Sequence, residues 1–290
     1  MPLTKRSRRR LGREALRGWY APRRDAYPWR GSHDPYAILV SEVMLQQTQA
    51  ARVVPAYASF LRRFPTVRAL AVAPRRDVVA QWGGLGYNRR AVRLSEAARA
   101  IVRDHGGRIP QDKDELLELP GVGPYTSAAV ASLGFGEPVA VVDTNVRRVV
   151  SRVHLGIEGH EAPARDVGAL AEAWLDRDDP VTWNQAVMDL GREVCRPQPR
   201  CDVCPLRRVC RFRRSGVTAS RGPRRQAAFE GSSRQVRGAV VNALRSHPWL
   251  TPARLASQTG FPVDRVDAAV ATLSVDGLVE VDAGRVRLAS

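Results

Sequence analysis

The segment Leu119-Pro-Gly-Val-Gly-Pro-Tyr-Thr126 places two glycines, Gly121 and Gly123, one residue apart between two helical patterns. Glycine lets the backbone approach a phosphate closely, and the amides that open the next helix point donors at an anion. Such a turn can hold a DNA strand without reading its bases. A bare Gly-x-Gly also occurs in ordinary turns between helices, so the rest of the chain must decide between the two interpretations.

Outward from this turn, residues 11–214 carry apolar side chains at three- and four-residue spacing, without a multi-stranded sheet pattern. The clearest helical patterns span Ala37–Leu45, Val53–Leu61, Ala91–Val102, Thr126–Leu133, Val146–Val153 and Trp183–Val194. This periodicity predicts an all-α body.

A second, smaller unit follows a stretch rich in Arg, Gly, Ser and Pro, residues 215–232, which is typical of a linker. The sequence beyond it predicts three helices and a hairpin turning at Ala283-Gly284. These elements are expected at Arg234–Ser246, Pro252–Gln258, Val263–Ser274, Leu278–Asp282 and Arg285–Leu288. Residues 233–290 are therefore expected to form a winged-helix-like module.

The charge balance bounds the class of partner. The 290 residues are 44% hydrophobic, enough for a packed core, and carry a formal net charge of +17. A field of that sign favours a polyanion, with nucleic acid as the first candidate and an anionic membrane surface as the second. No apolar run reaches the roughly 18 residues of a membrane span, so we expect no transmembrane helix. Of the two candidates we expect nucleic acid as the partner and no membrane. We read residues 1–10 as a basic, mobile arm without a secretion signal, and expect a cytoplasmic protein.

Two carboxylates have contrasting sequence environments. Glu42 lies in an almost wholly apolar helical run, where burial should raise its pKa and let it hold a proton near neutral pH. Asp143 precedes a predicted helix, whose N-terminal amides and dipole should stabilise the anion. An acid paired with an anion is what cleavage of a glycosidic bond requires. A buried Glu paired with Arg and a simple helix cap remain the alternatives.

All four cysteines, Cys195, Cys201, Cys204 and Cys210, fall within sixteen residues. Such a cluster in a chain without a secretion signal more often binds metal than forms disulfides. Four thiolates suit either tetrahedral zinc or an iron–sulfur cubane, and their spacing alone does not separate the two. The many arginines around this loop suggest that it lies against phosphates.

Several motifs in this order resemble the A/G-specific adenine DNA glycosylases of the endonuclease III superfamily. They are Ser41-Glu-Val-Met-Leu-Gln-Gln-Thr-Gln49, Leu85-Gly-Tyr87, Leu119–Thr126, Val142-Asp-Thr-Asn-Val-Arg-Arg148 and the cysteine cluster. The resemblance covers about residues 11–212 and implies a helix-hairpin-helix DNA glycosylase fold. It also selects a 4Fe-4S cluster over zinc.

The resemblance implies a domain division and a setting. Residues 11–34 and 136–214 would form the iron–sulfur helical domain, and residues 35–135 a six-helix domain that contains the hairpin. The partner would be double-stranded DNA with mismatched or oxidised base pairs, bound by a monomeric, nucleoid-associated enzyme of base excision repair.

The family pattern also assigns roles. Glu42 would protonate the adenine, Asp143 would stabilise the oxocarbenium-like sugar, and Asn145 would orient that site. The implied DNA contacts are Trp29, Arg30 and Leu45 around the extruded base, Gln46, Gln47 and Thr48 facing the orphaned base, Tyr87 as the wedge, and Gly121, Gly123 and Thr126 in the hairpin. Tyr125 stands where bifunctional relatives carry a nucleophilic lysine, so the enzyme is expected to be monofunctional.

The chain departs from the family pattern in three places. Residue 144 is Thr where the family usually has Gly, the first cysteine gap is five residues rather than six, and residues 233–290 stand in place of a Nudix-like domain that reads 8-oxoguanine. Two alternatives therefore stay open. One is a T/G- or U/G-specific thymine or uracil glycosylase, and the other is a non-catalytic iron–sulfur DNA-binding protein.

Overall fold

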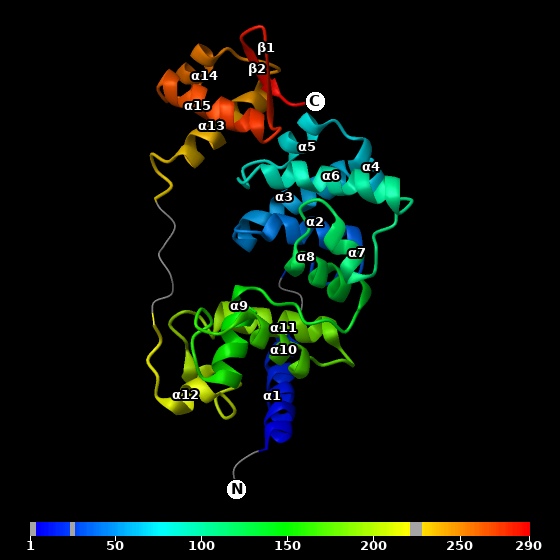
Figure 1. Ribbon diagram of the computed structural model, residues 1–290, viewed down its shortest axis with the longest axis vertical. Helices are drawn as coiled ribbons and strands as arrows, with labels where there is room; N and C mark the ends of the chain where they lie inside the picture. The colour runs from blue at the N-terminus through cyan, green and yellow to red at the C-terminus, as the bar shows by residue number, and fades with distance from the viewer. Residues whose placement is uncertain (1–3, 24–26, 221–227) are drawn as a thin grey trace. The chain divides into compact units, whose positions relative to one another are not determined.

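The computed structural model describes residues 4–23, 27–220 and 228–290, and their regular secondary structure is helical except for one two-stranded hairpin (Figure 1). The chain divides into two compact units, each with its own core. The first comprises Met1–Ile38, Gln111–Leu117 and Gly123–Arg224, and the second comprises Leu39–Pro110, Glu118–Val122 and Arg225–Ser290. The all-α prediction for the body is confirmed.

The first unit packs its helices around an aromatic core. Its main helices are α1 (Lys5–Tyr20), α7 (Lys113–Glu118), α8 (Pro124–Ala129), α9 (Thr144–Val150), α10 (Ala164–Trp174), α11 (Pro180–Glu193) and α12 (Arg211–Ser215). Trp174 packs edge-on against both Trp183, at 4.9 Å between ring centroids, and His154, at 4.7 Å. This core holds α9 against α10 and α11, which places the start of α9 at a fixed position.

Two of the predicted helices change type before they end. Helix α8 continues as a π-helix over Val130–Gly134, and α9 continues as a π-helix over Ser151–Leu155. Gly134 lies so close to Pro35 that an added Cβ would stand 3.1 Å from the proline Cα. Wider turns of this kind let a helix adjust to such close neighbours, and they are frequent near functional sites.

The structure corrects the predicted mobile arm, residues 1–10, from Thr4 onward, and residues 1–3 lie outside the described residues. Helix α1 begins at Lys5, inside that arm, and Thr4 caps it by accepting a hydrogen bond from the Ser7 amide at 3.1 Å. Arginine has a good helix propensity, and Arg10 pairs with Glu14 one turn later at 3.6 Å. The high positive charge of the segment therefore does not prevent a helix.

The second unit contains α2 (Pro35–Leu45) from residue 39 onward and four further helices of the body. These are α3 (Ala50–Arg63), α4 (Val67–Val72), α5 (Arg75–Gln81) and α6 (Arg89–Asp104). Phe60 packs edge-on against both Phe64 and Trp82, with centroids 5.0 and 5.9 Å apart. Helix α2 is buried from Tyr36 to Met44, so the apolar pattern read from the sequence does mark a core helix.

The winged-helix-like module is confirmed with boundaries within one residue of those predicted. It contains α13 (Ser233–Ser246), α14 (Pro252–Thr259), α15 (Val263–Val275), β1 (Val279–Asp282) and β2 (Arg285–Leu288). The strands pair antiparallel, and Leu250 adds a bridge to Val286. Ala283 and Gly284 both have positive φ, as a two-residue hairpin turn requires.

The module contacts helices α5 and α6 of the body. Within the second unit, Arg89 at the start of α6 pairs with Asp276 at 3.3 Å, and Arg75 of α5 donates to the Gly277 carbonyl at 3.3 Å. Arg237 also pairs with Asp276, at 2.5 Å. Asp276 of the module thus faces Arg89 of the body, and Arg237 of the module pairs with the same carboxylate.

Candidate active site

Asp143 is held at the N-terminus of α9, as predicted. Its Oδ1 accepts a hydrogen bond from the Val146 amide at 2.6 Å, and its Oδ2 accepts one from Asn145 Nδ2 at 2.7 Å. Arg148 Nη2 donates to Asn145 Oδ1 at 2.9 Å and to the Gly191 carbonyl at 2.8 Å. The carboxylate is therefore fixed in one orientation, and Asn145 is the side chain that orients it.

The direction in which the pKa of Asp143 moves is opposite to our expectation. Burial raises the pKa of Asp143, and this outweighs the lowering by the hydrogen bonds from Val146 and Asn145 and by the charge of Arg148. Sequence reasoning identified the cap but not the loss of solvent, which disfavours a charged carboxylate.

Glu42 occupies the middle of the buried part of α2. Glu42 is only 4% exposed, and its sequence neighbours Ser41 and Val43 are also buried. The burial that the sequence predicted is thus confirmed. Glu42 belongs to the second unit and Asp143 to the first.

The segment Gln46–Thr48 follows α2, and its backbone is unusual. Gln47 has a φ of 54° and Tyr87 a φ of 47°, and in the described part of the chain only Ala283 joins them as a non-glycine with positive φ. A left-handed conformation costs an L-residue about 1–2 kcal/mol, and such conformations cluster at binding sites. Both residues are among those predicted to face DNA, and Tyr87 is 41% exposed.

Trp29 and Arg30 lie in the first unit, just before α2. The Trp29 ring stacks on Tyr27 with centroids 5.1 Å apart. Arg30 Nη2 contacts Asp189 Oδ1 of α11 at 2.7 Å, and both side chains are largely buried. This ion pair gives Arg30 a structural role, because it ties the segment to α11.

The predicted hairpin turn lies between α7 and α8. Gly121 has a φ of 78°, and a Cβ there would stand 2.6 Å from Arg93 Cβ, so only glycine fits. Gly123 is the N-cap residue of α8, and Tyr125 and Thr126 lie in the first turn. The turn thus has the two glycines and the following helix start that the motif predicts.

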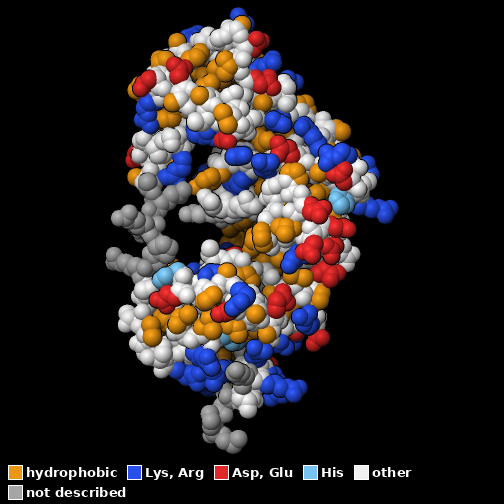
Figure 2. Space-filling model, viewed as in Figure 1, with side chains coloured by type: hydrophobic (Ala, Val, Ile, Leu, Met, Phe, Trp, Pro, Cys, Tyr) orange, Lys and Arg blue, Asp and Glu red, His pale blue; other side chains and the backbone are white. Residues whose placement is uncertain are grey.

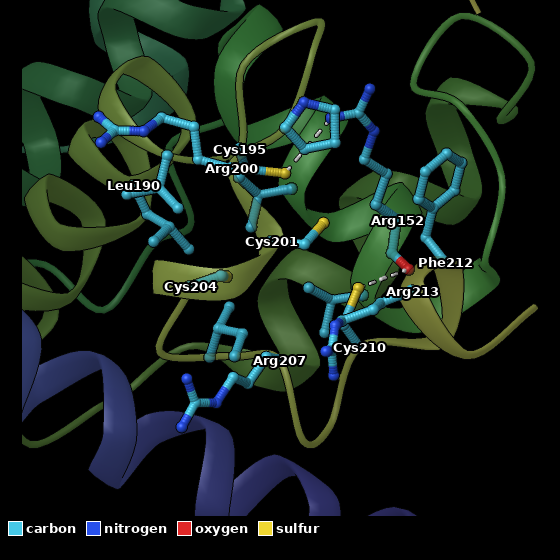
Figure 3. Close-up of a pocket in the computed structure, with 15 residues that line it drawn as sticks. Arg152, Leu190, Cys195, Arg200, Cys201, Cys204, Arg207, Cys210, Phe212 and Arg213 are labelled. Carbon is cyan, nitrogen blue, oxygen red and sulfur yellow. Dashed lines mark hydrogen bonds between the residues drawn. The ribbon is translucent and has the colours of Figure 1, made fainter. Parts of the chain in front are cut away.

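The four cysteines line one cavity of the first unit, with the side chains of Cys195, Cys201 and Cys210 drawn around its centre (Figure 3). None of the four forms a disulfide. The apolar part of the wall includes Val149, Val153, Leu190, Val194, Leu206 and Phe212. Among the described residues, no three His, Cys, Asp or Glu side chains converge as ligands of a single ion.

A buried arginine stands beside this cavity. Arg152 forms an ion pair with Glu158 at 2.8 Å, and both side chains are at most 6% exposed. Its Nη1 also lies 3.6 Å from Cys195 Sγ and 2.6 Å from the Arg196 carbonyl. Burial raises the pKa of the Cys204 thiol to about 12 and also raises the pKa of Cys195, where the charge and hydrogen bond of Arg152 act in the opposite direction and favour the thiolate. Four thiols beside a buried cation are donors of the kind that a thiolate-ligated metal group needs, although these side chains do not converge on one point in this structure.

Lys and Arg side chains lie on the surfaces of both units, interspersed with acidic and apolar side chains (Figure 2). None of the helices in the described part of the chain combines the length and the apolar character that a membrane span requires.

Arg90 was not among the residues predicted from the sequence, although its guanidinium contacts both the Gln46–Thr48 segment and the loop before Tyr87.

Comparison with known proteins places the chain. Residues 40–174 match the HhH-GPD superfamily base excision DNA repair proteins. The adenine DNA glycosylase of Mycolicibacterium smegmatis is 43% identical over 94% of this chain and 94% of its own. The thymine/uracil-DNA glycosylase of Methanothermobacter thermautotrophicus is 34% identical over 67% of this chain and 89% of its own. A solved thermostable thymine-DNA glycosylase superposes with a TM-score of 0.68, at 30% identity, over 72% of this chain and 98% of its own. The chain therefore belongs to the HhH-GPD superfamily and, within it, to the adenine DNA glycosylase family.

Proposed function

We propose that this protein is a monofunctional adenine DNA glycosylase of base excision repair, acting on adenine mispaired with guanine or 8-oxoguanine in double-stranded DNA. The observation that carries the proposal is the 43% identity to an adenine DNA glycosylase over 94% of both chains. The buried Glu42 and the oriented Asp143 supply the two carboxyl groups that the chemistry needs. We expect the enzyme to work as a monomer, associated with the nucleoid.

In this proposal the target adenosine leaves the base stack, because its glycosidic bond cannot be reached inside a duplex. Glu42 donates a proton to a ring nitrogen of adenine, and the C1′–N9 bond breaks with its electron pair leaving on the base. Asp143, as the carboxylate, stabilises the positive charge on the sugar. Water then adds to C1′ and loses a proton, which leaves an abasic site.

Tyr125 is the basis of the monofunctional assignment. A lysine at this position would attack C1′ and form a Schiff base, which permits strand cleavage, whereas a phenol cannot form one. We therefore propose that the product strand stays intact until alkali or another enzyme cleaves it.

We propose that Cys195, Cys201, Cys204 and Cys210 hold a 4Fe-4S cluster. The support is a donor set of four thiols around one apolar cavity, with the Arg152 cation beside it. Bound there, the cluster supplies a cross-link that stabilises the loop. Anaerobically purified protein should contain four irons per chain, and stoichiometric zinc without iron would contradict the assignment.

The second candidate is a glycosylase for thymine or uracil opposite guanine, which the 34% identical thymine/uracil-DNA glycosylase favours. Incubation with A:8-oxoG, A:G, T:G and U:G duplexes, followed by alkaline cleavage of abasic sites, distinguishes the two activities. A protein that only binds DNA would leave all four duplexes uncleaved. Excision of adenine alone is expected.

The variant Glu42→Gln should lose excision and keep duplex binding, because the substitution removes the acidic proton and keeps the shape of the side chain. Activity within about tenfold of wild type would exclude Glu42 as the acid.

A further inference from the structure

Arg90 lies in the first turn of α6 and directs its guanidinium into a cluster of oxygen atoms. The Nη1 and Nη2 groups donate to the carbonyls of Val43 (2.8 Å), Met44 (2.8 Å), Gln46 (2.5 Å) and Gly86 (3.1 Å) and to the Thr48 hydroxyl (3.0 Å). The carbonyls of Val43 and Met44 belong to the last turn of α2, where helix carbonyls lack intrahelical partners. One side chain thus caps α2 and contacts two separate loops.

The two loops that Arg90 contacts contain the two strained residues of the predicted DNA surface. Gln46 and Thr48 flank Gln47, and Gly86 precedes Tyr87. Gln47 and Tyr87 both have positive φ, which an L-residue keeps only when its surroundings enforce it. The bonds from Arg90 fall directly beside both positions, so they are contacts of the kind that can enforce it.

The guanidinium is also placed against rings. Its carbon lies 5.4 Å from the Trp82 ring centroid and 5.6 Å from that of Tyr87. Burial lowers the pKa of Arg90 to about 10, so the group keeps its charge at neutral pH. A planar cation with several donors suits this position, since it can stack and donate at the same time.

We propose that Arg90 is a positioning residue that holds the Gln46–Thr48 segment and the Tyr87 wedge in register with each other. This rests on the proposed function, in which the first segment faces the orphaned base and Tyr87 enters the stack. Arg90 itself touches no substrate atom in this proposal. It sets the preference for the opposite base by fixing where these two loops stand.

The test compares Arg90→Met and Arg90→Lys with a matched control, Arg99→Met. Arg99 lies on the same helix and also donates to backbone carbonyls, those of Ala71 at 3.2 Å and Ala73 at 3.3 Å, which lie outside both DNA-facing loops. Single-turnover adenine excision is measured on an A:G duplex and on a duplex with adenine opposite a tetrahydrofuran abasic-site analogue. Hydrogen exchange at the amides of residues 46–48 and 86–88 reports the loops directly.

Arg90→Met should slow excision from A:G by about tenfold or more, because small misplacements of positioning groups have large effects on rate. The loss should be smaller opposite the abasic analogue, which has no base for Gln46–Thr48 to hold. The excision rate of Arg90→Lys should be close to that of Arg90→Met, since one ammonium group cannot replace the several donors of the guanidinium. Arg99→Met should keep the wild-type ratio between the two duplexes.

An unchanged ratio in Arg90→Met, or wild-type behaviour of Arg90→Lys, would overturn the proposal. If Arg90→Met does not fold, the ratio and the hydrogen exchange of Arg90→Lys decide. A wild-type protein that excises adenine from neither duplex would instead refute the proposed function. In that case faster exchange confined to the two loops of Arg90→Lys still supports the positioning role, and unchanged exchange refutes it.

Discussion

Gly191 allows α11 to approach the start of α9, where Asn145 orients Asp143. A Cβ at residue 191 would stand 2.7 Å from Asn145 Cβ and 3.0 Å from the Asn145 carbonyl oxygen. The variant Gly191→Ala adds that atom to the contact. Because backbone and a Cβ are the atoms in the way, the crowding cannot be relieved by rotating a side chain.

The magnitude follows from these distances. The gap must open by about 0.7 Å to reach the 3.4 Å at which ordinary contact begins. Overpacking of this kind costs about 1–3 kcal/mol, and alanine returns about 1 kcal/mol of helix propensity, which leaves a loss of up to about 2 kcal/mol. The midpoint of thermal unfolding should fall by up to about 8 °C. Displacement of Asn145 should slow adenine excision by about 10- to 100-fold.

Thermal unfolding and single-turnover excision from an A:G duplex measure the two effects. Gly168→Ala is the matched control, because Gly168 also lies within a helix of the first unit but has nothing within 4 Å of an added Cβ. The control should gain up to about 1 kcal/mol of stability and keep its rate. If Gly191→Ala melts as high as the control and excises adenine at the wild-type rate, the argument from close approach is refuted.

Three further predictions follow from other contacts. Burial raises the pKa of Asp143 in the folded state, so its contribution to stability is present below the unfolded pKa and is lost as pH rises through the folded one. Wild type should therefore lose stability relative to Asp143→Asn as the pH rises above about 4, and parallel unfolding midpoints would contradict this. Asp276→Lys should loosen the module and speed proteolysis between residues 215 and 232, because the new lysine would face Arg89 and Arg237. The control Asp267→Lys, at an exposed position, should leave the rate of proteolysis unchanged. Equal rates of proteolysis in the two variants would exclude Asp276 from docking. Tyr125→Lys should form borohydride-trapped DNA adducts absent from wild type, and adducts of comparable yield in wild type would refute the monofunctional assignment.

Short stretches of sequence were enough to predict much of the fold. Apolar spacing alone identified α2, α6 and α11, and the turn Ala283-Gly284 located the hairpin of the module. The burial of Glu42 and the cap formed by Asp143 were also predicted from neighbouring residues. These features depend on residues a few positions apart, which is why a pattern in the chain suffices to predict them.

Tertiary packing decided what no short stretch contains. Arg90 gained its role because the end of α2 and the loop before Tyr87 meet around it, although the contacted residues of α2 are more than forty positions away. The pKa of Asp143 rises because surrounding elements remove its solvent, and Asp276 finds Arg89 only once the module has docked. Desolvation and hydrogen bonding depend on what surrounds a group in space, so they are determined only when distant parts of the chain come together.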